Sequence, residues 1–157
     1  MSATTRIAIF GGSFNPVHAG HVGLVKAAFA RLDPDLVIVM PAFVSPFKTA
    51  SGERDFFPPA ERLRLVEEAF KDFPKVQVDA RELQKGGVSY AIDTVREIAA
   101  EHPGAKLYFL VGEDSVPGLE KWKDIARLKT LCEFVSFPRT PESSTAIRER
   151  LRREALT

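Results

Sequence analysis

The chain has 157 residues, 45% of them hydrophobic, which is the size of one ordinary domain with enough apolar surface to bury a core. Its 22 Lys and Arg residues balance 21 Asp and Glu residues, which excludes a general basic field for nucleic acid. No apolar stretch is long enough to span a bilayer, and residues 1–5 do not resemble a secretory signal. The single cysteine, Cys132, lies in an apolar run and is expected to be a buried small side chain in a reducing compartment. We therefore expect one cytoplasmic domain over residues 1–157, with neither nucleic acid nor a membrane as its partner.

Short apolar segments alternate with longer amphipathic ones along the whole chain. The apolar segments are typical of strands covered on both faces, because they show little polar alternation. They predict five strands, at residues 6–10, 35–40, 75–79, 106–111 and 131–137. The amphipathic segments predict helices at residues 20–32, 59–73, 89–102 and 144–153, and a short one within 114–128. This alternation predicts an α/β fold with a doubly wound, five-stranded parallel sheet.

Residue types at the element ends support these boundaries. Pro58 and Pro59 suit a first helical turn. Ser89 is expected to cap the helix that follows it, with Asp93 near the positive end of the helix dipole. In a doubly wound sheet, ligands bind beyond the carboxyl ends of the strands, at the point where the strand order reverses. The first and fourth strands flank that point, so the segments that follow these two strands are expected to line the site.

A glycine-containing turn joins the first strand to the first helix, in the string GGSFNPVHAGH at residues 11–21. The two glycines are expected to let the backbone turn sharply and bring amide groups close to an anion, and the helix adds the positive end of its dipole. His18 and His21 are three residues apart, so both imidazoles are expected to donate hydrogen bonds to phosphoryl oxygens and to charge that develops in a transition state. The alternatives are a glycine turn with two incidental histidines and a zinc site, and the lack of a third ligand nearby disfavours zinc. The string therefore predicts a phosphate-binding site and no protein-held metal.

This string resembles the GxFxPxHxGH motif of the nucleotidylyltransferase superfamily, and the rest of the chain resembles the bacterial nicotinate mononucleotide adenylyltransferases. Three further motifs follow in the family's order: SYAIDT at residues 89–94, VGEDS at residues 111–115 with Trp122 after it, and SSTAIR at residues 143–148. The resemblance implies a Rossmann-like fold and transfer of AMP from ATP to nicotinate mononucleotide, which forms deamido-NAD and pyrophosphate in NAD biosynthesis. It implies ATP and a small phosphorylated acceptor as partners, with Mg²⁺ carried by the ATP, and it leaves a homo-oligomer open.

The resemblance also assigns roles to individual residues. The catalytic residues that it implies are His18, His21, Lys48 and Arg148. The ATP-binding residues that it implies are Gly11, Gly12, Ser13, Phe14, His18, His21, Gly112, Asp114, Ser144, Thr145 and Arg148. The acceptor-binding residues that it implies are Asn15, Lys48, Ser89, Tyr90, Ala91 and Trp122. Taken singly, several have ordinary alternatives: Lys48 and Arg148 as solvated cations, Asp114 as a helix cap and Trp122 as a core residue.

The sequence departs from the family at three places. Ala91 stands where the family usually has Thr, SPFK at residues 45–48 replaces PPHK, and the chain is shorter before and after the SSTAIR motif. Two other functions therefore stay open. One is the same chemistry on another phosphorylated acceptor, such as phosphopantetheine or nicotinamide mononucleotide. The other is a catalytically silent module that binds a nucleotide.

Overall fold

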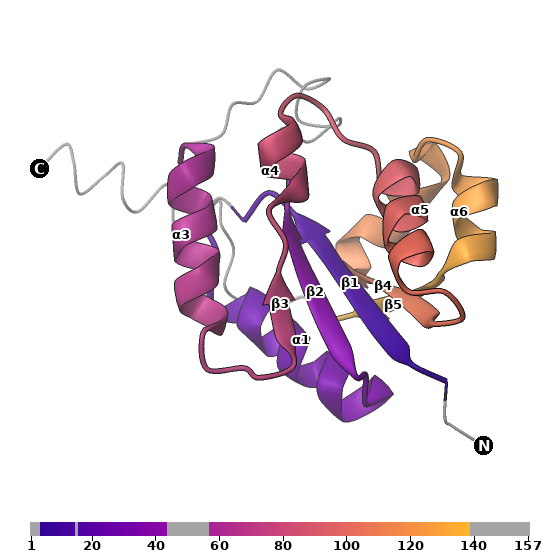
Figure 1. The fold of residues 1–157 in the computed structure, drawn as a ribbon, viewed down its shortest axis with the longest axis horizontal. Helices are drawn as coiled ribbons and strands as arrows, with labels where there is room; N and C mark the ends of the chain where they lie inside the picture. Colours follow the sequence, from indigo (N-terminus) through magenta and orange to yellow (C-terminus); the bar gives the residue numbers. More distant parts are fainter. Residues whose placement is uncertain (1–3, 15, 44–56, 139–157) are drawn as a thin grey trace, which may run out of the picture.

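The computed structural model describes residues 4–14, 16–43 and 57–138, and Figure 1 shows their arrangement. Five strands form one parallel sheet in the order β3-β2-β1-β4-β5. The strands are β1 (Arg6–Gly12), β2 (Leu36–Pro41), β3 (Val76–Val78), β4 (Lys106–Gly112) and β5 (Glu133–Phe137). Each strand begins and ends within two residues of its predicted bounds, so the predicted five-stranded parallel sheet is confirmed.

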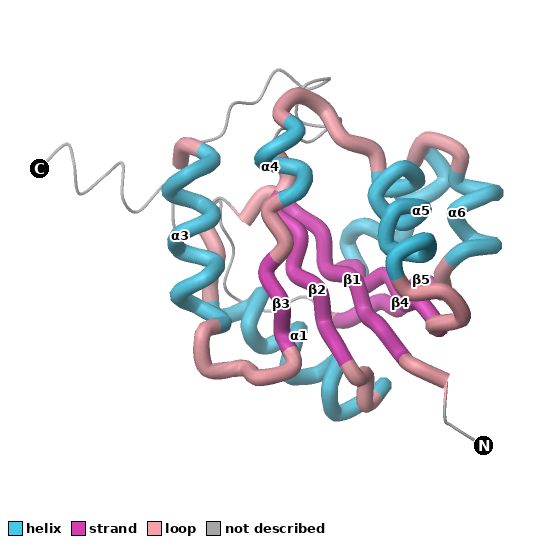
Figure 2. Tube along the Cα trace, in the orientation of Figure 1, coloured by secondary structure: helices cyan, strands magenta, loops and turns pink. Residues whose placement is uncertain are grey.

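Helices connect the strands and cover the sheet (Figure 2). They are α1 (Ala19–Leu32), α3 (Pro59–Phe70), α4 (Arg81–Lys85), α5 (Ala91–Glu101), the 3₁₀ helix η1 (Glu113–Lys121) and α6 (Ile125–Leu131). The helix α4 was not predicted, because five residues are too short to show a helical periodicity. The predicted helix at residues 144–153 lies outside the described residues.

The predicted piece within residues 114–128 is divided into two helices. Pro117 lies inside η1 and has no backbone N–H to donate, and η1 ends at Lys121, before Trp122, whose backbone is extended. Asp124, with a left-handed backbone at φ 54°, then begins α6. Trp122 and Lys123 lie between the two helices, so their side chains project from a corner of the chain rather than from one helix face.

The two faces of the sheet carry separate buried clusters. One face packs against α5, η1 and α6, and its strand residues are Ile7, Ile9, Ile38, Met40, Leu107, Phe109 and Val111. The opposite face packs against α1 and α3, and its strand residues are Ala8, Phe10, Val37, Val39, Tyr108, Leu110, Val135 and Phe137. Consecutive strand residues thus alternate between two covered faces, which is why the strands show no polar alternation. The doubly wound architecture is confirmed.

Two predictions about element ends have different outcomes. Pro59 occupies the first turn of α3, as predicted. The predicted Ser89 cap is wrong: Tyr90 is the residue at the N-cap of α5, and no side chain caps that helix. The hydroxyl of Ser89 is instead buried and finds no hydrogen-bond partner among the described residues.

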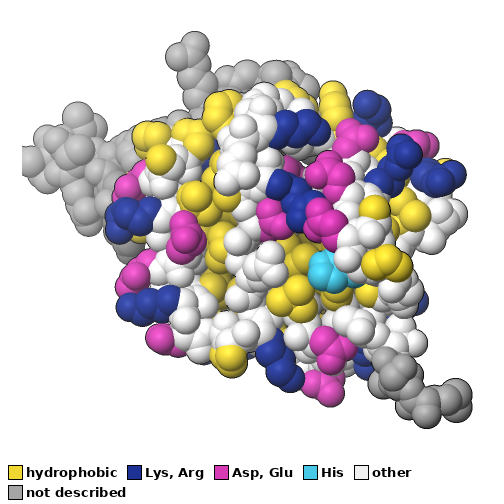
Figure 3. All heavy atoms as spheres, in the orientation of Figure 1, with side chains coloured by type: hydrophobic (Ala, Val, Ile, Leu, Met, Phe, Trp, Pro, Cys, Tyr) yellow, Lys and Arg dark blue, Asp and Glu magenta, His cyan; other side chains and the backbone are white. Residues whose placement is uncertain are grey.

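The surface agrees with the balanced composition. On the face drawn in Figure 3, basic and acidic side chains are interspersed, without a large field of one sign. Cys132 is buried and its thiol donates to the carbonyl of Leu128, as a small core residue would. Within the described residues, no helix is long and apolar enough to cross a membrane.

Candidate active site

The sheet opens at the carboxyl ends of its two central strands. The chain leaves β1 toward β2 and β3 and later crosses back to β4, so the strand order reverses between β1 and β4. The ladder between β1 and β2 continues to Gly12, which pairs with Pro41, whereas the ladder between β1 and β4 stops at Ile9 and Phe109. The last three residues of β1 therefore have no partner in β4, at the place where doubly wound folds bind their ligands.

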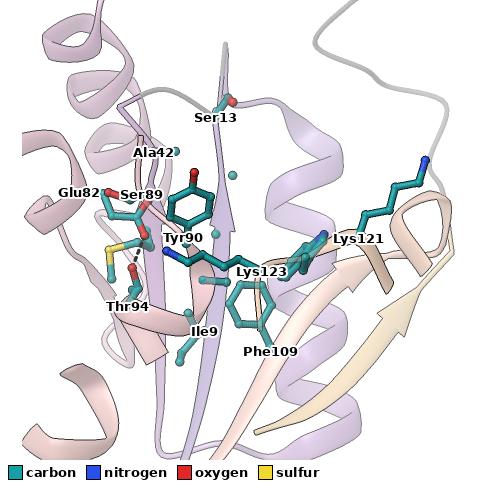
Figure 4. A pocket seen from close by; sticks show the side chains of 15 residues that line it. Ile9, Ser13, Ala42, Glu82, Ser89, Tyr90, Thr94, Phe109, Lys121 and Lys123 are labelled. Carbon is teal, nitrogen blue, oxygen red and sulfur yellow. Dashed lines mark hydrogen bonds between the residues drawn. The ribbon is translucent and has the colours of Figure 1, made fainter. Parts of the chain in front are cut away.

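A pocket of about 380 Å³ occupies this opening (Figure 4). Its walls come from the ends of β1 and β2, from α4, from the start of α5 and from the corner after η1. The lining residues are Ile9, Gly11, Gly12, Ser13, Met40, Ala42, Glu82, Ser89, Tyr90, Ala91, Thr94, Phe109, Lys121, Trp122 and Lys123. Seven of the residues predicted to bind ATP or the acceptor are thereby brought together: Gly11, Gly12, Ser13, Ser89, Tyr90, Ala91 and Trp122.

The backbone turn after β1 is made differently from the prediction. Gly11 and Gly12 are the last residues of the strand, and neither has a positive φ. The left-handed residue is Phe14, at φ 49°, a conformation that costs a bulky residue about 1–3 kcal/mol. The glycines instead leave bare backbone in the pocket wall, where a Cβ on Gly11 would lie 3.5 Å from the ring of Phe109. That distance is an ordinary van der Waals contact, so the two glycines expose backbone to the pocket and do not make the turn of the chain.

Aromatic packing holds the left-handed Phe14 in place. Its side chain is only 2% exposed and lies edge-on to Phe10, with ring centroids 5.2 Å apart. It also lies edge-on to His21, at 4.9 Å between centroids. Because the side chain of Phe14 belongs to the core, any contact that this residue makes with a nucleotide must come from its backbone.

The two histidines form a reciprocal cap at the start of α1. The Nδ1 atom of His18 accepts from the N–H of Gly20 at 3.0 Å, and the Nδ1 atom of His21 accepts from the N–H of His18 at 3.0 Å. A neutral imidazole has one donor and one acceptor nitrogen, so these bonds place the proton of each ring on Nε2. The ring centroids are 3.8 Å apart and the ring planes are tilted by 33°, so the two rings are in direct contact. The cap therefore fixes the tautomer that offers N–H donors on the side away from the helix.

Burial keeps His21 uncharged. Loss of hydration, together with the neighbouring His18, lowers the pKa of His21 to about 3. At neutral pH this side chain is consequently a neutral hydrogen-bond donor rather than a cation.

One side of the pocket is aromatic with a cationic edge. Trp122 is half-buried, and its ring lies edge-on to Phe109 at 5.4 Å between centroids. The ammonium of Lys123 lies 4.4 Å from the centroid of the Tyr90 ring. In Figure 4 the Lys123 side chain runs along the pocket, whereas the ammonium of Lys121 points away from it.

Sequence reasoning missed a polar group on the opposite wall. Thr94 donates to the carboxylate of Glu82 at 2.6 Å, and both side chains line the pocket. Burial raises the pKa of Glu82 above its usual value. The hydroxyl of Ser89, on the same side of the pocket, has no partner among the described residues. The position of Glu82 just beyond the third strand, at the carboxyl edge of the sheet, was the available signal.

Sequence reasoning also missed Arg62. This residue stands four and eight positions before Val66 and Phe70, which are buried, so it occupies the apolar stripe of α3. A charged residue on an apolar stripe was the signal that could have found it. Its side chain is fully buried and donates to backbone carbonyls beside the pocket.

Other predicted site residues lie apart from this pocket or outside the described residues. Gly112 is the last residue of β4 rather than the first residue after it, and Asp114 follows the strand as predicted and is exposed in the first turn of η1; neither lines the pocket. His18 and His21 are at the start of α1 rather than in the pocket lining. The residues outside the described part of the chain are Asn15, Lys48, Ser144, Thr145 and Arg148.

Comparison with known proteins agrees with this architecture. Residues 9–150 match the family model described as cytidylyltransferase-like. A probable nicotinate-nucleotide adenylyltransferase of Nitratiruptor sp. is 40% identical over 130 residues, which is 83% of this chain and 71% of the relative. Another from Aliarcobacter butzleri is 34% identical over 144 residues, which is 92% of this chain and 77% of the relative.

Solved structures share the fold. The nicotinic acid mononucleotide adenylyltransferase of Plasmodium falciparum, solved with NaAD, has a TM-score of 0.71 at 14% identity, covering 92% of this chain and 83% of that one. A structure from Vibrio parahaemolyticus, also described as a nicotinate-nucleotide adenylyltransferase, has a TM-score of 0.79 at 23% identity and covers 96% of this chain and 89% of that one. The chain is therefore a nucleotidyltransferase of the cytidylyltransferase-like family, and it belongs with the nicotinate-nucleotide adenylyltransferases.

Proposed function

We propose that this chain transfers the adenylyl group of ATP to nicotinate mononucleotide, forming deamido-NAD and releasing pyrophosphate. The observation that carries the proposal is the aromatic pocket with a cationic edge, which opens at the switch point beside the glycine backbone and close in sequence to the paired imidazoles. We place the pyridine ring of the acceptor against Trp122, where the ammonium of Lys123 suits the carboxylate that distinguishes nicotinate from its amide.

The reaction is an in-line displacement. A phosphate oxygen of the acceptor attacks the α-phosphorus of ATP, the new P–O bond forms, and the bond from the α-phosphorus to the bridging oxygen breaks as pyrophosphate leaves. No covalent bond to the protein is needed. Catalysis then consists of positioning the reactants and neutralising charge on the phosphoryl oxygens.

We assign the predicted residues to these tasks. His18 and His21 donate through Nε2–H to phosphoryl oxygens of ATP, a task that fits the tautomer set by their Nδ1 bonds. The backbone of residues 11–14, with Gly112 and Asp114 across the opening, holds the nucleotide. Lys48, Ser144, Thr145 and Arg148 contact its phosphates, and Asn15, Ser89, Tyr90, Ala91 and Trp122 hold the acceptor.

Magnesium enters this scheme as part of the substrate. Among the described residues, no group of three or more His, Cys, Asp and Glu side chains is placed to hold a metal ion. A magnesium ion that rides on the ATP phosphates keeps most of its waters and needs no cage of protein ligands.

The experiment that tests the function is pyrophosphate release from ATP by the purified chain with each of three acceptors. We expect release with nicotinate mononucleotide, with deamido-NAD identified by mass, and much slower release with nicotinamide mononucleotide and with phosphopantetheine. Preference for either of the other acceptors would replace the proposed substrate. ATP binding without release for any acceptor would identify a silent nucleotide-binding module.

Fluorescence tests the acceptor position independently of turnover. Trp122 is the only tryptophan in the chain, so its emission reports on this pocket alone. Stacking of an electron-poor pyridine ring should quench it saturably, and more strongly for nicotinate mononucleotide than for its amide. Intact ATP binding with no fluorescence response to either mononucleotide would remove Trp122 from the acceptor site.

A further inference from the structure

The guanidinium of Arg62 ties together three backbone segments around the pocket. Its Nη1 atom donates to the carbonyl of Ser13 at 2.7 Å and to that of Ala42 at 2.6 Å. Its Nη2 atom donates to the carbonyl of Phe43 at 2.9 Å, and its Nε atom donates to that of Phe57 at 3.1 Å. Four of the five N–H donors of a guanidinium are thus used on main-chain acceptors.

The segments that Arg62 joins are distant in sequence and meet only at the carboxyl edge of the sheet. Ser13 follows β1, Ala42 and Phe43 follow β2, and Phe57 precedes α3. A direct bond from the N–H of Ala42 to the carbonyl of Gly12, at 2.8 Å, links the first two segments as well. Arg62 reaches them from one position in the first turn of α3.

Two of the four carbonyls belong to residues that form the pocket wall. Ser13 and Ala42 line the pocket, and they lie next to Gly12 and Pro41, the last residue pair of the ladder between β1 and β2. Arg62 itself is 0% exposed and is not among the lining residues. It therefore fixes the wall from behind and cannot touch a bound substrate.

Burying a guanidinium is costly, and an ordinary helix would place an apolar residue at this position. Loss of hydration disfavours a buried charge unless hydrogen bonds replace the lost water. Buried backbone carbonyls after two strands also need hydrogen-bond donors, because a buried carbonyl without a donor costs free energy. One fork-shaped cation satisfies several such carbonyls at once and fixes their relative positions.

We propose that Arg62 is a positioning residue for adenylyl transfer, which holds the backbone after β1 and β2 in the arrangement that the reactants require. This proposal rests on the proposed function, because it assigns the wall formed by residues 11–13 and 42 to bound substrate. In-line transfer is sensitive to small displacements of the groups that hold the reactants. We call the four hydrogen bonds from Arg62 to these backbone carbonyls the clamp. Loss of the clamp should therefore lower kcat more than it raises KM for ATP or the acceptor.

The test compares Arg62→Met with Val66→Ala. Val66 is one turn further along α3, is also 0% exposed and lies in the apolar core, so its truncation destabilises the same helix without touching the clamp. Both variants are assayed at a temperature where circular dichroism shows each to be fully folded. We expect Arg62→Met to lower kcat at least 20-fold with less than a fivefold change in either KM, and Val66→Ala to keep kcat within twofold.

Arg62→Lys keeps the test decisive if Arg62→Met does not fold. A lysine ammonium keeps the charge but cannot span the same carbonyls as a planar fork, so an intermediate loss of kcat is expected. In Arg62→Ala, which lacks the guanidinium group, millimolar guanidinium added to the assay should restore part of the lost rate. The same addition should leave the rate of the wild type unchanged. Wild-type kcat in folded Arg62→Met or Arg62→Lys, or an equal loss of kcat in Val66→Ala, would overturn the proposal.

A readout without turnover separates this proposal from the proposed function. In Arg62→Met, amide hydrogen exchange should become faster in peptides that cover residues 11–14 and 40–43, and it should not in Val66→Ala. Unchanged exchange in these peptides would overturn the clamp even if the wild type is active. Faster exchange in a chain whose wild type releases no pyrophosphate with any acceptor would instead count against the proposed function alone.

Discussion

Under the proposed function the two ring nitrogen atoms of His21 have separate tasks, with Nδ1 in the helix cap and Nε2–H toward ATP, and substitution can separate them. Asn at position 21 keeps an acceptor for the N–H of His18 but removes the Nε2–H donor, whereas Gln keeps an N–H near Nε2 and removes the cap. We expect His21→Asn to keep most of the stability and to lose about 10²–10³-fold in kcat, the loss seen when one preorganised donor to transition-state charge is removed.

The paired variant completes this prediction. His21→Gln should retain more activity than His21→Asn and lose about 1 kcal/mol of stability, typical of a lost N-terminal cap. Steady-state kinetics and thermal unfolding of both variants check the pair. If His21→Asn turned over like the wild type, His21 would be a capping residue and nothing more.

The lowered pKa of His21 has a consequence for stability at acidic pH. The pKa is about 3 in the folded chain and near the usual 6.5 when unfolded, so below pH 6.5 the unfolded chain gains a proton that the folded chain does not. The contribution of neutral His21 is therefore fully present above pH 6.5 and is lost progressively as the pH falls toward 3.

Thermal unfolding at pH 7, 5.5 and 4 measures this effect. The Tm of the wild type should fall more steeply over this range than the Tm of His21→Asn, which has no titrating group at position 21. Other groups that titrate here, such as Glu82, are common to both proteins and cancel in the comparison. If the Tm of both proteins fell equally with pH, the pKa of His21 in the folded chain would not be lowered.

At the scale of elements, a residue before α5, Ser89, is expected to affect acceptor binding without contributing to the stability of the fold. The helix begins at Ala91 without a side-chain cap, and the hydroxyl of Ser89 is buried with no partner among the described residues. A buried hydroxyl without a partner contributes nothing to stability, so Ser89→Ala should leave the Tm unchanged or raise it slightly. If that hydroxyl turns to the bound acceptor, the same variant should raise the acceptor KM about fivefold, the size of one neutral hydrogen bond.

Calorimetry and kinetics on Ser89→Ala check this division, with Thr94→Val as the comparison. Thr94→Val leaves the half-buried side chain of Glu82 without its donor at 2.6 Å, so it should lower the Tm and weaken acceptor binding. A lower Tm for Ser89→Ala would show that the hydroxyl has a partner within the free protein.

At the scale of the whole molecule, Cys132 is a probe of global opening. It is the single cysteine, it is buried between α6 and β5, and burial raises the pKa of its thiol to about 12. Because the thiolate is the reacting form, a chromogenic disulfide reagent at pH 8 should label the native chain orders of magnitude more slowly than the urea-unfolded chain. Cys132→Ala gives the blank, and complete labelling of native protein within minutes would contradict this packing.

The whole molecule also explains why the pocket has its position. Two faces of the sheet are covered by different helices, and the strand order reverses between β1 and β4, so the ladder between these strands can end early without exposing a core. The pocket is bounded by residues of six elements, β1, β2, α4, α5, β4 and η1, and of the loops beside them. Gly12, Tyr90 and Trp122 thus converge on the pocket through topology rather than through nearness in sequence.

The sequence by itself determined the five strands, the main helices and the position of the glycine and histidine string, because these depend on local periodicity and on residue types near one another. Tertiary structure decided what local patterns cannot encode. Phe14 rather than a glycine takes the left-handed turn, because burial between Phe10 and His21 offsets its strain. Ser89 lines the pocket instead of capping α5, because the N-cap of that helix is one residue later, at Tyr90. Arg62 is buried because it meets carbonyls from three distant segments, and that need exists only once the strands have been brought side by side.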